Sequence, residues 1–395
     1  MGPWAVVSSK GQVRRLKTIP RGARVPLSIV HALAPAPFGG LETVLLHLAT
    51  GLSAAGENVT VAPIVGPDEG DEHPFVRSLE GTDVRITPIE LPGRGYIAER
   101  RAVGELLRRV GADVLHTHGY RPDVVSSGVA ARAGVPRVTT VHGFTGGGGK
   151  NRLYEALQRR VFRRFDAVIA VSAKLERELV ASGISADIVH VVRNAFPSDG
   201  TALGRAQARA KLGLPEGVPV VGWVGRLSPE KAPDIFVRAA ATTAASDADV
   251  HFSVIGAGSE LERSERIAAE AGVQDRVRFH GQVEGAGRLL SAFDVLALTS
   301  WTEGTPMVLL EAMSQGVPIV TTAVGGIPDV LAADEARLVE AGDVAGIGKA
   351  IVDLLDDPEL ARDVADAARS RLERDFAVDS WIERHIEIYR SLVRS

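Results

Sequence analysis

Short hydrophobic runs alternate with longer amphipathic segments along most of the chain. The runs are nearly continuous in aliphatic and β-branched residues, as expected for strands that are buried on both faces of a parallel sheet. In the N-terminal half they are VPLSIVHAL, NVTVAPIV, ADVLHTHG, VPRVTTVHG, FDAVIAVS and DIVHVVRNAF. The segments between them, such as ETVLLHLATGLSAAG, have the apolar spacing of helices. This alternation predicts an α/β fold with helices on both faces of a parallel sheet.

The pattern pauses at residues 193–212 and then restarts with VPVVGWVGRL, ADVHFSVIGAG, RVRFHG, FDVLALTS, GVPIVTT and ARLVE. A chain of 395 residues suits two domains. We therefore expect two Rossmann-like domains, residues 25–197 and residues 198–375, that face each other across a cleft. Residues 1–24 are basic without an acidic residue, and we expect a disordered tail. Residues 376–395 should form a helix that caps the second domain or crosses back to the first.

Composition narrows the functional classes. There is no cysteine, which excludes a disulfide scaffold, a thiol nucleophile and a zinc site with cysteine ligands. No apolar run is long enough to cross a membrane, and no secretory signal is evident, so a cytoplasmic protein is expected. The net charge of −4 argues against a nucleic-acid partner. Residues 1–197 carry +7 and the remainder −11, so either the first half meets an anionic surface or its solvated faces differ by chance.

The segment GWVGRLSPEK places two cations just after a predicted strand. The strand ends at Gly225, and Arg226 and Lys231 follow in the loop. Ligands of open parallel sheets bind beyond the carboxyl ends of the strands, and these two cations suit a diphosphate there. Taken alone, the segment is better explained as an ordinary solvated basic loop.

The segment SWTEGTPMVLLEAMSQGVPIV carries a loop and a helix start after another predicted strand. Glu303 lies in the loop, Pro306 suits the first turn of the helix, and Glu311 lies further along it. The amides around residues 305–308 can hold a phosphate with help from the helix dipole. Carboxylates on both sides of such an anion site indicate a ligand in which a sugar, a diphosphate and a ribose follow one another.

Two strand ends in the first half carry glycine or histidine. Gly39 and Gly40 can let a ligand approach the backbone, although the nicotinamide fingerprint is missing. His142 follows a strand and precedes a glycine-rich loop, so it either contacts the transferred group or is structural. His116 and His118 could share a metal ion, but no further ligand is evident, so no metal site is predicted.

Two further segments carry charged motifs. The string Asp247-Ala248-Asp249 resembles a metal–diphosphate motif, but it precedes a strand and so lies at the wrong end of the sheet. Residues 152–166 form a basic amphipathic segment that either lies on an anionic membrane or is a solvated helix face. Its arginines are Arg159, Arg160, Arg163 and Arg164.

Together these motifs resemble the retaining glycosyltransferases of family 4, which have the GT-B fold. The resemblance runs from about Pro26 to the C-terminus. It is carried by FGGLE, DVLHTHGY, TTVHGF, GRLSPEK and above all by EGTPMVLLEAM followed by GVPIVTTAVGGIPDV. The family's hinge string is replaced here by Val192-Arg193-Asn194-Ala195-Phe196.

The resemblance implies a role for each matching residue. His142 would contact the donor sugar, Arg226 and Lys231 would neutralise the leaving diphosphate, and Glu303 would bind sugar hydroxyls. Glu311 would hold the ribose. The remaining donor-site positions are Gly39, Gly40, Gly225, Val283, Gly304, Thr305, Pro306, Met307 and Val308.

The expected function is transfer of a sugar (EC 2.4) from a nucleotide-diphospho-sugar, with a UDP-sugar favoured over a GDP-sugar. The acceptor would be a glycan or glycolipid of cell-envelope or exopolysaccharide synthesis, at the inner face of the membrane. Neither a cofactor nor a metal ion is expected. Two alternatives stay open: a nucleotide-sugar-binding module without turnover, and a nucleotide-sugar epimerase of the same architecture.

Overall fold

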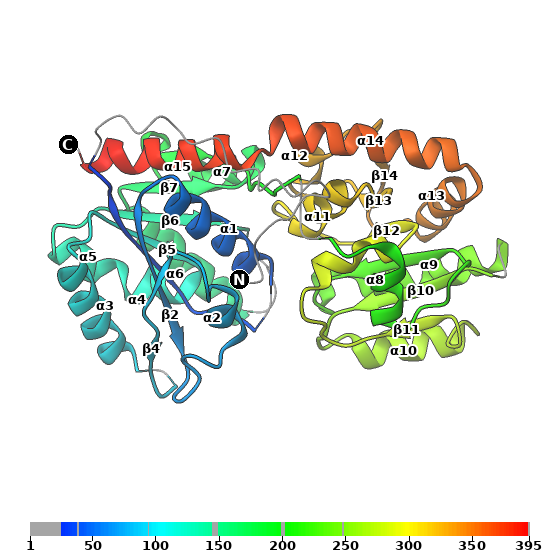
Figure 1. The fold of residues 1–395 in the computed structure, drawn as a ribbon, viewed down its shortest axis with the longest axis horizontal. Helices are drawn as coiled ribbons and strands as arrows, with labels where there is room; N and C mark the ends of the chain where they lie inside the picture. The colour runs from blue at the N-terminus through cyan, green and yellow to red at the C-terminus, as the bar shows by residue number, and fades with distance from the viewer. Residues whose placement is uncertain are drawn as a thin grey trace. The chain divides into compact units, whose positions relative to one another are not determined.

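The chain divides into two compact units. A computed structural model describes residues 25–37, 39–93, 95–143, 149–198, 202–246 and 249–393. For residues 149–152 it describes the backbone only. One unit comprises the residues up to Asn194 together with those from Val378, and the other extends from Ala195 to Ala377. Each has its own parallel sheet with helices on both faces (Figure 1). The tail predicted at residues 1–24 lies outside the described residues.

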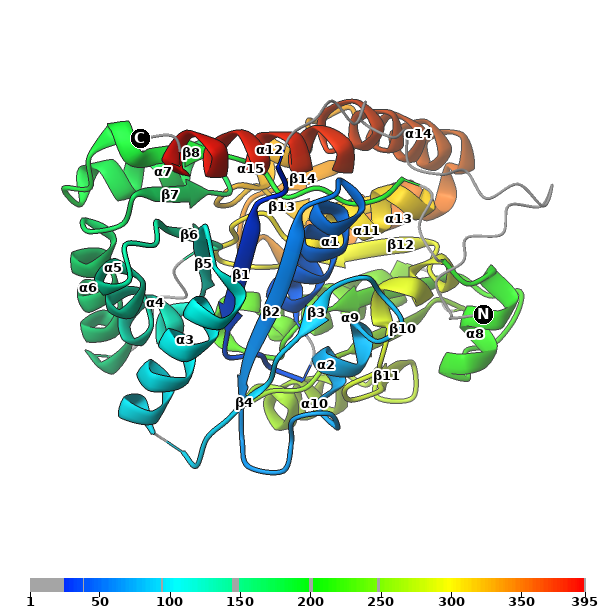
Figure 2. The same cartoon turned by 60° about the vertical axis from the view of Figure 1, so that its left-hand side comes forward.

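The N-terminal unit is built on a sheet of order β3-β2-β1-β5-β6-β7-β8, with β4 also paired to β2, and these pairings are parallel. Figure 2 brings this sheet forward. The strands are β1 (Ser28–Leu33), β2 (Asn58–Val65), β3 (Arg85–Ile86), β4 (Ile89–Glu90), β5 (Val114–His118), β6 (Arg137–Val141), β7 (Ala167–Ala170) and β8 (Val189–Val191). The helices are α1 (Gly40–Ala54), α2 (Pro74–Ser78), α3 (Tyr96–Val110), α4 (Tyr120–Val125), α5 (Ser127–Arg132), α6 (Gly149–Phe162), α7 (Ala173–Ala181), η1 (Ala186–Ile188) and α15 (Val378–Val393).

Side-chain alternation along β1 decides which helices cover which face of this sheet. Val30 and Ala32 pack with apolar residues of α3 and α5 in one core cluster. Ile29, His31 and Leu33 alternate with them and face the opposite way, toward α1 and α15. These two helices contact each other (Figures 1 and 2), and a Cβ added at Gly51 of α1 would overlap the side chain of Ile382. The C-terminal helix thus packs on the N-terminal unit.

The C-terminal unit has the sheet order β11-β10-β9-β12-β13-β14, again parallel. Its strands are β9 (Val220–Val224), β10 (His251–Ile255), β11 (Val277–Phe279), β12 (Val295–Leu298), β13 (Ile319–Thr322) and β14 (Arg337–Val339). Its helices are α8 (Arg205–Leu212), η2 (Pro229–Lys231), α9 (Pro233–Ser246), α10 (Leu261–Glu270), η3 (Ala286–Ala292), α11 (Met307–Gln315), α12 (Ile327–Val330), α13 (Val344–Asp356) and α14 (Pro358–Asp375).

Two features of this unit position its polar loops. Apolar residues of α9, α10 and α13 pack with the strands around the buried Trp223. From β9 the strand order proceeds to β10 and β11 on one side, whereas β12, β13 and β14 follow on the other side. The order therefore reverses between β9 and β12. In open α/β sheets, ligands bind at the carboxyl ends of the strands at such a reversal.

The prediction of two α/β domains with parallel sheets is confirmed. The two-residue strands β3 and β4 were not predicted, because such short pieces carry no periodicity. The basic segment predicted at residues 152–166 is helical only as far as Phe162, so Arg163 and Arg164 follow the helix. Among the helices of the described part of the chain, none has the length and apolar character needed to cross a bilayer.

Candidate functional site

The loop that follows β9 is fixed by close backbone contacts. The amide of Gly225 donates to the carbonyl of Ile255 at 3.0 Å. Gly256 has φ +142°, and a Cβ added there would overlap the carbonyl oxygen of Gly225. Because only glycine allows this approach, the loops after β9 and β10 pack directly on each other. This packing sets the start of the loop that carries Arg226 and Lys231.

Lys231 and Glu303 form a close ion pair at the reversal of strand order. Lys231 ends η2 after β9, and Glu303 lies in the loop after β12. The Lys231 Nζ lies 2.6 Å from Glu303 Oε1 and 2.7 Å from Oε2. The Ser300 hydroxyl donates to the same carboxylate at 2.6 Å. The Glu303 side chain is 5% exposed and that of Lys231 22% exposed, so the pair is largely shielded from water.

The backbone around Glu303 is held by the next loop of the sheet. The carbonyl of Glu303 accepts from the amide of Gly326 at 3.1 Å. A Cβ added at Gly325, which has φ +60°, would overlap the same carbonyl. The Thr322 hydroxyl donates to the carbonyl of Ser300 at 2.7 Å. The loops after β12 and β13 thus support the carboxylate of Glu303 from the backbone.

Arg226 lies closer to solvent than Lys231. Its guanidinium is 3.2 Å from Glu230, and its side chain is 61% exposed. An exposed ion pair of this kind contributes little to stability. Both cations that the sequence assigns to a diphosphate are thus paired with a carboxylate in this structure, and Lys231 is the better shielded of the two.

The helix α11 starts next to Glu303. Pro306 has extended ψ (119°) and flanks the helix, which begins at Met307, so the prediction that it lies in the first turn was wrong by one position. No side chain caps this helix N-terminus. The first-turn amides and the helix dipole therefore suit an anion near Thr305, Met307 and Val308. Gly304 precedes them in the loop.

Glu311 and Val283 lie beside neighbouring loops of the same unit. The carboxyl group of Glu311 packs so closely on Gly287 that an added Cβ would lie 2.5 Å from it. Burial of this carboxyl raises its pKa to about 7. Val283 is half-buried in the loop after β11, which is tied to β10 by the Gly256 amide donating to the Gly281 carbonyl at 2.8 Å. The Glu311 carboxyl can bind hydroxyl groups, and the Val283 side chain can pack on a ring.

Three candidate residues lie on the N-terminal unit. Gly39 flanks α1, which Gly40 opens, and a Cβ at Gly39 would overlap the carboxylate of Glu42. The same carboxylate accepts from the amide of Ala36 at 2.8 Å. His142 follows β6; its Nε2 is buried without a hydrogen-bond partner in the described structure, and burial lowers the pKa of the ring to about 4. Of the Asp-Ala-Asp string, the first two residues lie outside the described residues.

The structure also gathers histidines that sequence reasoning had not combined. In the parallel register His31 of β1 lies opposite His116 of β5, and His118 follows on the same face. The ring centroid of His31 lies 5.1 Å from that of His116 and 5.3 Å from that of His118. His142 and His385 lie next to this group. The signal available in the sequence was a histidine within each of two apolar strand runs, but only the strand register joins them.

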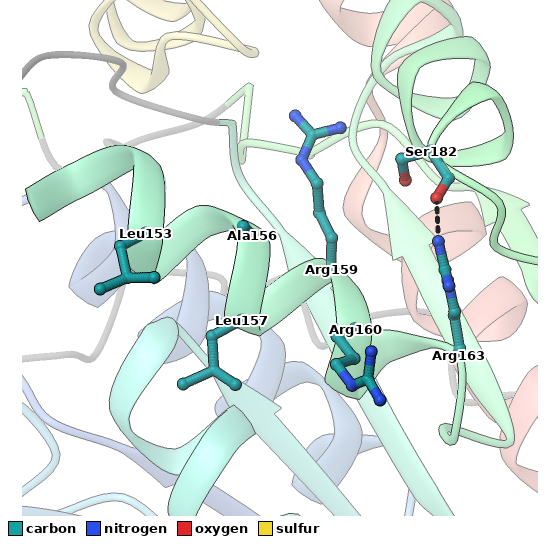
Figure 3. Close-up of a pocket in the computed structure, with 7 residues that line it drawn as sticks. All are labelled: Leu153, Ala156, Leu157, Arg159, Arg160, Arg163 and Ser182. Atoms are coloured by element: carbon teal, nitrogen blue, oxygen red, sulfur yellow. Dashed lines mark hydrogen bonds between the residues drawn. The ribbon is translucent and has the colours of Figure 1, made fainter. Parts of the chain in front are cut away.

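The basic helix α6 presents apolar and cationic side chains together (Figure 3). Leu153 and Leu157 are 68% and 40% exposed. The Arg163 guanidinium donates to the carbonyl of Ser182 at 2.6 Å, at the end of α7. Arg160 is exposed beside them. Leucines and arginines of α6 and of the residues after it thus form an exposed surface that is both apolar and basic.

Family models match both units. Residues 38–199 match the model described as Glycosyltransferase Family 4, and residues 204–371 match that described as Glycosyl transferases group 1. A D-inositol 3-phosphate glycosyltransferase of Salinispora tropica is 30% identical over 96% of this chain and 86% of its own length. The N-acetyl-alpha-D-glucosaminyl L-malate synthase of Bacillus anthracis is 29% identical over 74% of this chain and 78% of its own.

Solved structures share the fold. Anabaena HepE in complex with UDP-glucose superposes with a TM-score of 0.80 and 21% identity, over 92% of this chain and 99% of that one. WaaG, a glycosyltransferase involved in lipopolysaccharide biosynthesis, gives a TM-score of 0.70 and 20% identity over 91% and 99% of the two chains. The family matches span both units and include the loops that carry Lys231 and Glu303. The chain belongs to glycosyltransferase family 4 and is a glycosyltransferase.

Proposed function

We propose that this protein transfers a sugar, with retention at the anomeric carbon, from a nucleotide-diphospho-sugar to a glycan or lipid-linked acceptor. The observation that carries the proposal is the Lys231–Glu303 pair at the reversal of strand order in the C-terminal unit. A UDP-sugar is the first candidate donor, and the fold shared with a protein solved in complex with UDP-glucose supports it.

The pair combines the two contacts that such a donor needs. Glu303 can accept hydrogen bonds from sugar hydroxyls. The Lys231 Nζ contacts both oxygens of Glu303, and because an ammonium has three N–H donors, at least one remains for a phosphate oxygen. Without this ammonium the carboxylate would repel the diphosphate, because both are negative. The Lys231–Glu303 pair is itself neutral, so the site can hold sugar and phosphate side by side, and Arg226 and the first amides of α11 are left to offset the charge of the diphosphate.

The neighbouring loops complete the proposed donor site. Arg226 and the first amides of α11 would stabilise the negative charge that develops on the leaving diphosphate, without a metal ion. Glu311 would bind the ribose hydroxyls, and Val283 would flank the base. For Gly39, Gly40 and His142, on the N-terminal unit, the proposed donor contacts rest on the family resemblance alone.

The proposed reaction balances without a cofactor. The bond between the anomeric carbon and the phosphate oxygen breaks, and the acceptor oxygen forms its bond to that carbon on the same face. A diphosphate oxygen takes the acceptor's proton, so no protein base is required. The protein's contribution is to position the reactants and to stabilise the departing charge.

We further propose that the exposed surface of α6 rests on an anionic membrane, as a lipid-linked acceptor of cell-envelope or exopolysaccharide synthesis would require. Leu153, Leu157 and Arg160 recur at helical spacing on α6, and Arg164 is exposed just after the helix ends. Arg159 and Arg163 lie beside them. Basic residues near an anionic bilayer contribute about 1 kcal/mol each, and exposed leucines can enter the interface.

A ligand panel tests the donor site. Thermal unfolding would be followed with UDP, GDP, ADP, TDP and their common sugars, in Mg²⁺ and in chelator. A donor at 100 times its dissociation constant adds about 2.7 kcal/mol, which should raise the melting temperature by roughly 5–10 °C. We expect a UDP compound to do so in chelator as well. A shift that requires Mg²⁺ would contradict binding without a metal ion, and no shift with any nucleotide would contradict the site.

Matched variants assign the contacts. Changing Arg226 and Lys231 to alanine should weaken nucleotide binding at least 10-fold, whereas Lys211→Ala on α8 should not. Glu303→Gln should keep the shift caused by the nucleoside diphosphate and lose the extra shift caused by its sugar; Glu265→Gln is the control. Turnover assays with saccharide and lipid acceptors then separate a transferase from a binding module or an epimerase. The anomeric configuration of the product tests retention.

A further inference from the structure

Five histidines, four of them buried and His142 half-buried, come together in the N-terminal unit, and the proposed chemistry uses only His142. They are His31 on β1, His116 and His118 on β5, His142 after β6 and His385 on α15. The side chains of His31 and His116 are fully buried, and that of His118 is 2% exposed. A protein interior holds imidazoles at a cost unless their nitrogens find partners. The contacts of each ring nitrogen therefore decide how costly the burial of these histidines is.

The nitrogen atoms of three of the rings lie at metal-ligand spacing. One nitrogen each from His31, His116 and His118 can be chosen so that all three lie within 4.8 Å of one another. The Nδ1 of His31 and the Nε2 of His118 are 3.0 Å apart, so the two rings share one proton. The other nitrogens of these two rings, His31 Nε2 and His118 Nδ1, are buried without a hydrogen-bond partner in the described structure.

Hydrogen bonds to His116 supply the outer contact that a ligand histidine needs. One ring nitrogen lies 2.7 Å from the hydroxyl of Tyr389 and the other 2.8 Å from that of Thr140. A histidine that binds a metal ion through one nitrogen is oriented by a hydrogen bond from the other. Either contact can play this part once the opposite nitrogen turns to the ion. Burial also keeps the three rings neutral, and the neutral imidazole is the form that binds metal.

We propose that His31, His116 and His118 form a binding site for a divalent transition-metal ion of the Zn²⁺ class. Three imidazoles suit Zn²⁺, Ni²⁺ or Cu²⁺, whereas Mg²⁺ and Ca²⁺ require oxygen ligands. The ion would lie between His31 Nδ1 and His118 Nε2, and the proton now shared there would move to the outer nitrogen of the ring that carries it, so that both imidazoles stay neutral. Water or hydroxide would take the remaining position. Its role is structural, because it would connect β1 to β5. It goes beyond the proposed sugar transfer, which needs no metal ion.

Metal binding to untagged protein tests this site without an activity assay. The full chain would be stripped with a chelator, incubated with Zn²⁺ at micromolar free concentration, dialysed and analysed for bound metal. A second sample would be unfolded and refolded in Zn²⁺, so that slow entry to a buried site cannot hide binding. We expect one ion per chain and a melting temperature raised by roughly 5–10 °C at 100 times the dissociation constant. When Co²⁺ replaces Zn²⁺, the protein should show the visible absorption of a cobalt ion coordinated by nitrogen atoms.

The variants His31→Gln and His118→Gln should each remove the bound ion and the thermal shift. His251→Gln, on β10 of the other unit, should keep both. Circular dichroism of the metal-free variants checks that they are folded, and having two independent variants keeps the test informative if one of them is not. The proposal is overturned if both wild-type samples bind no ion. It is equally overturned if folded His31→Gln and His118→Gln protein binds as much ion as the wild type.

Discussion

The Lys231–Glu303 pair predicts a strong energetic coupling in the C-terminal unit. The perturbation is Lys231→Met, which keeps the length of the side chain and removes the ammonium. The Glu303 side chain is only 5% exposed, so its carboxylate then has no positive charge beside it. Its remaining side-chain partner is the Ser300 hydroxyl at 2.6 Å. Breaking a buried ion pair by removing one partner costs about 3–5 kcal/mol. Because the Lys231 side chain is 22% exposed, water can partly replace it, and we expect about 2–3 kcal/mol.

A double-mutant cycle separates this coupling from the other effects of each substitution. Glu303→Gln should cost about 1–2 kcal/mol, because Lys231 can turn toward water. The double variant should cost less than the sum of the two single variants by at least 1 kcal/mol, since neither unpaired charge remains. Urea unfolding followed by tryptophan fluorescence, to which the buried Trp223 of the same unit contributes, measures each free energy.

The control for the cycle is an exposed pair in the same unit. Lys349 and Asp353 lie 2.7 Å apart, but the Lys349 side chain is 74% exposed. Lys349→Met should therefore cost less than about 0.5 kcal/mol. The reasoning is refuted if Lys231→Met costs no more than Lys349→Met, or if the two single costs at the Lys231–Glu303 pair add within about 0.3 kcal/mol.

Two further predictions concern charge on other elements. Changing Arg160 and Arg164 to glutamine should weaken binding to anionic vesicles roughly 30-fold, at about 1 kcal/mol per arginine. The same change at Arg362 and Arg369 of α14 should leave vesicle binding unchanged. Flotation that shows no preference for anionic over neutral vesicles would contradict the membrane proposal. The raised pKa of Glu311, about 7 against an ordinary 4.5, means that the folded state loses stability as pH rises from about 4.5 to 7. Glu311→Gln should therefore stabilise the protein at pH 8 by about 3 kcal/mol and not at pH 4, and an equal effect at both values in urea unfolding would contradict this account.

The sequence was sufficient to predict the fold because strands buried on both faces are continuous apolar runs. It also predicted that Lys231 and Glu303 follow strands of one parallel sheet, so that both lie at its carboxyl edge. It did not predict that these two side chains contact each other. That contact depends on the order β9-β12 within the sheet, and strand order is not encoded in local periodicity.

The histidine group shows the same limit more sharply. His116 and His118 are two residues apart in one strand, so their common face could be predicted. His31 precedes them by more than eighty residues, and only the pairing of β1 with β5 places it opposite His116. Tyr389 comes from α15, whose packing partner the sequence left open. Local pattern thus predicts elements and strand ends, whereas contacts between elements depend on tertiary packing.

The position of α15 has a consequence for the order in which the protein is made. This helix supplies Tyr389 to His116 and an ion pair from Arg390 to Glu57, at 2.7 Å, in the N-terminal unit. Translation has to pass through the whole of Ala195–Ala377 before the helix exists, which takes about 10–40 s at ordinary rates. During that interval the nascent N-terminal unit exposes the apolar surface that α15 later covers. The C-terminal unit is continuous in sequence, so it can finish folding first even though its residues are synthesised second.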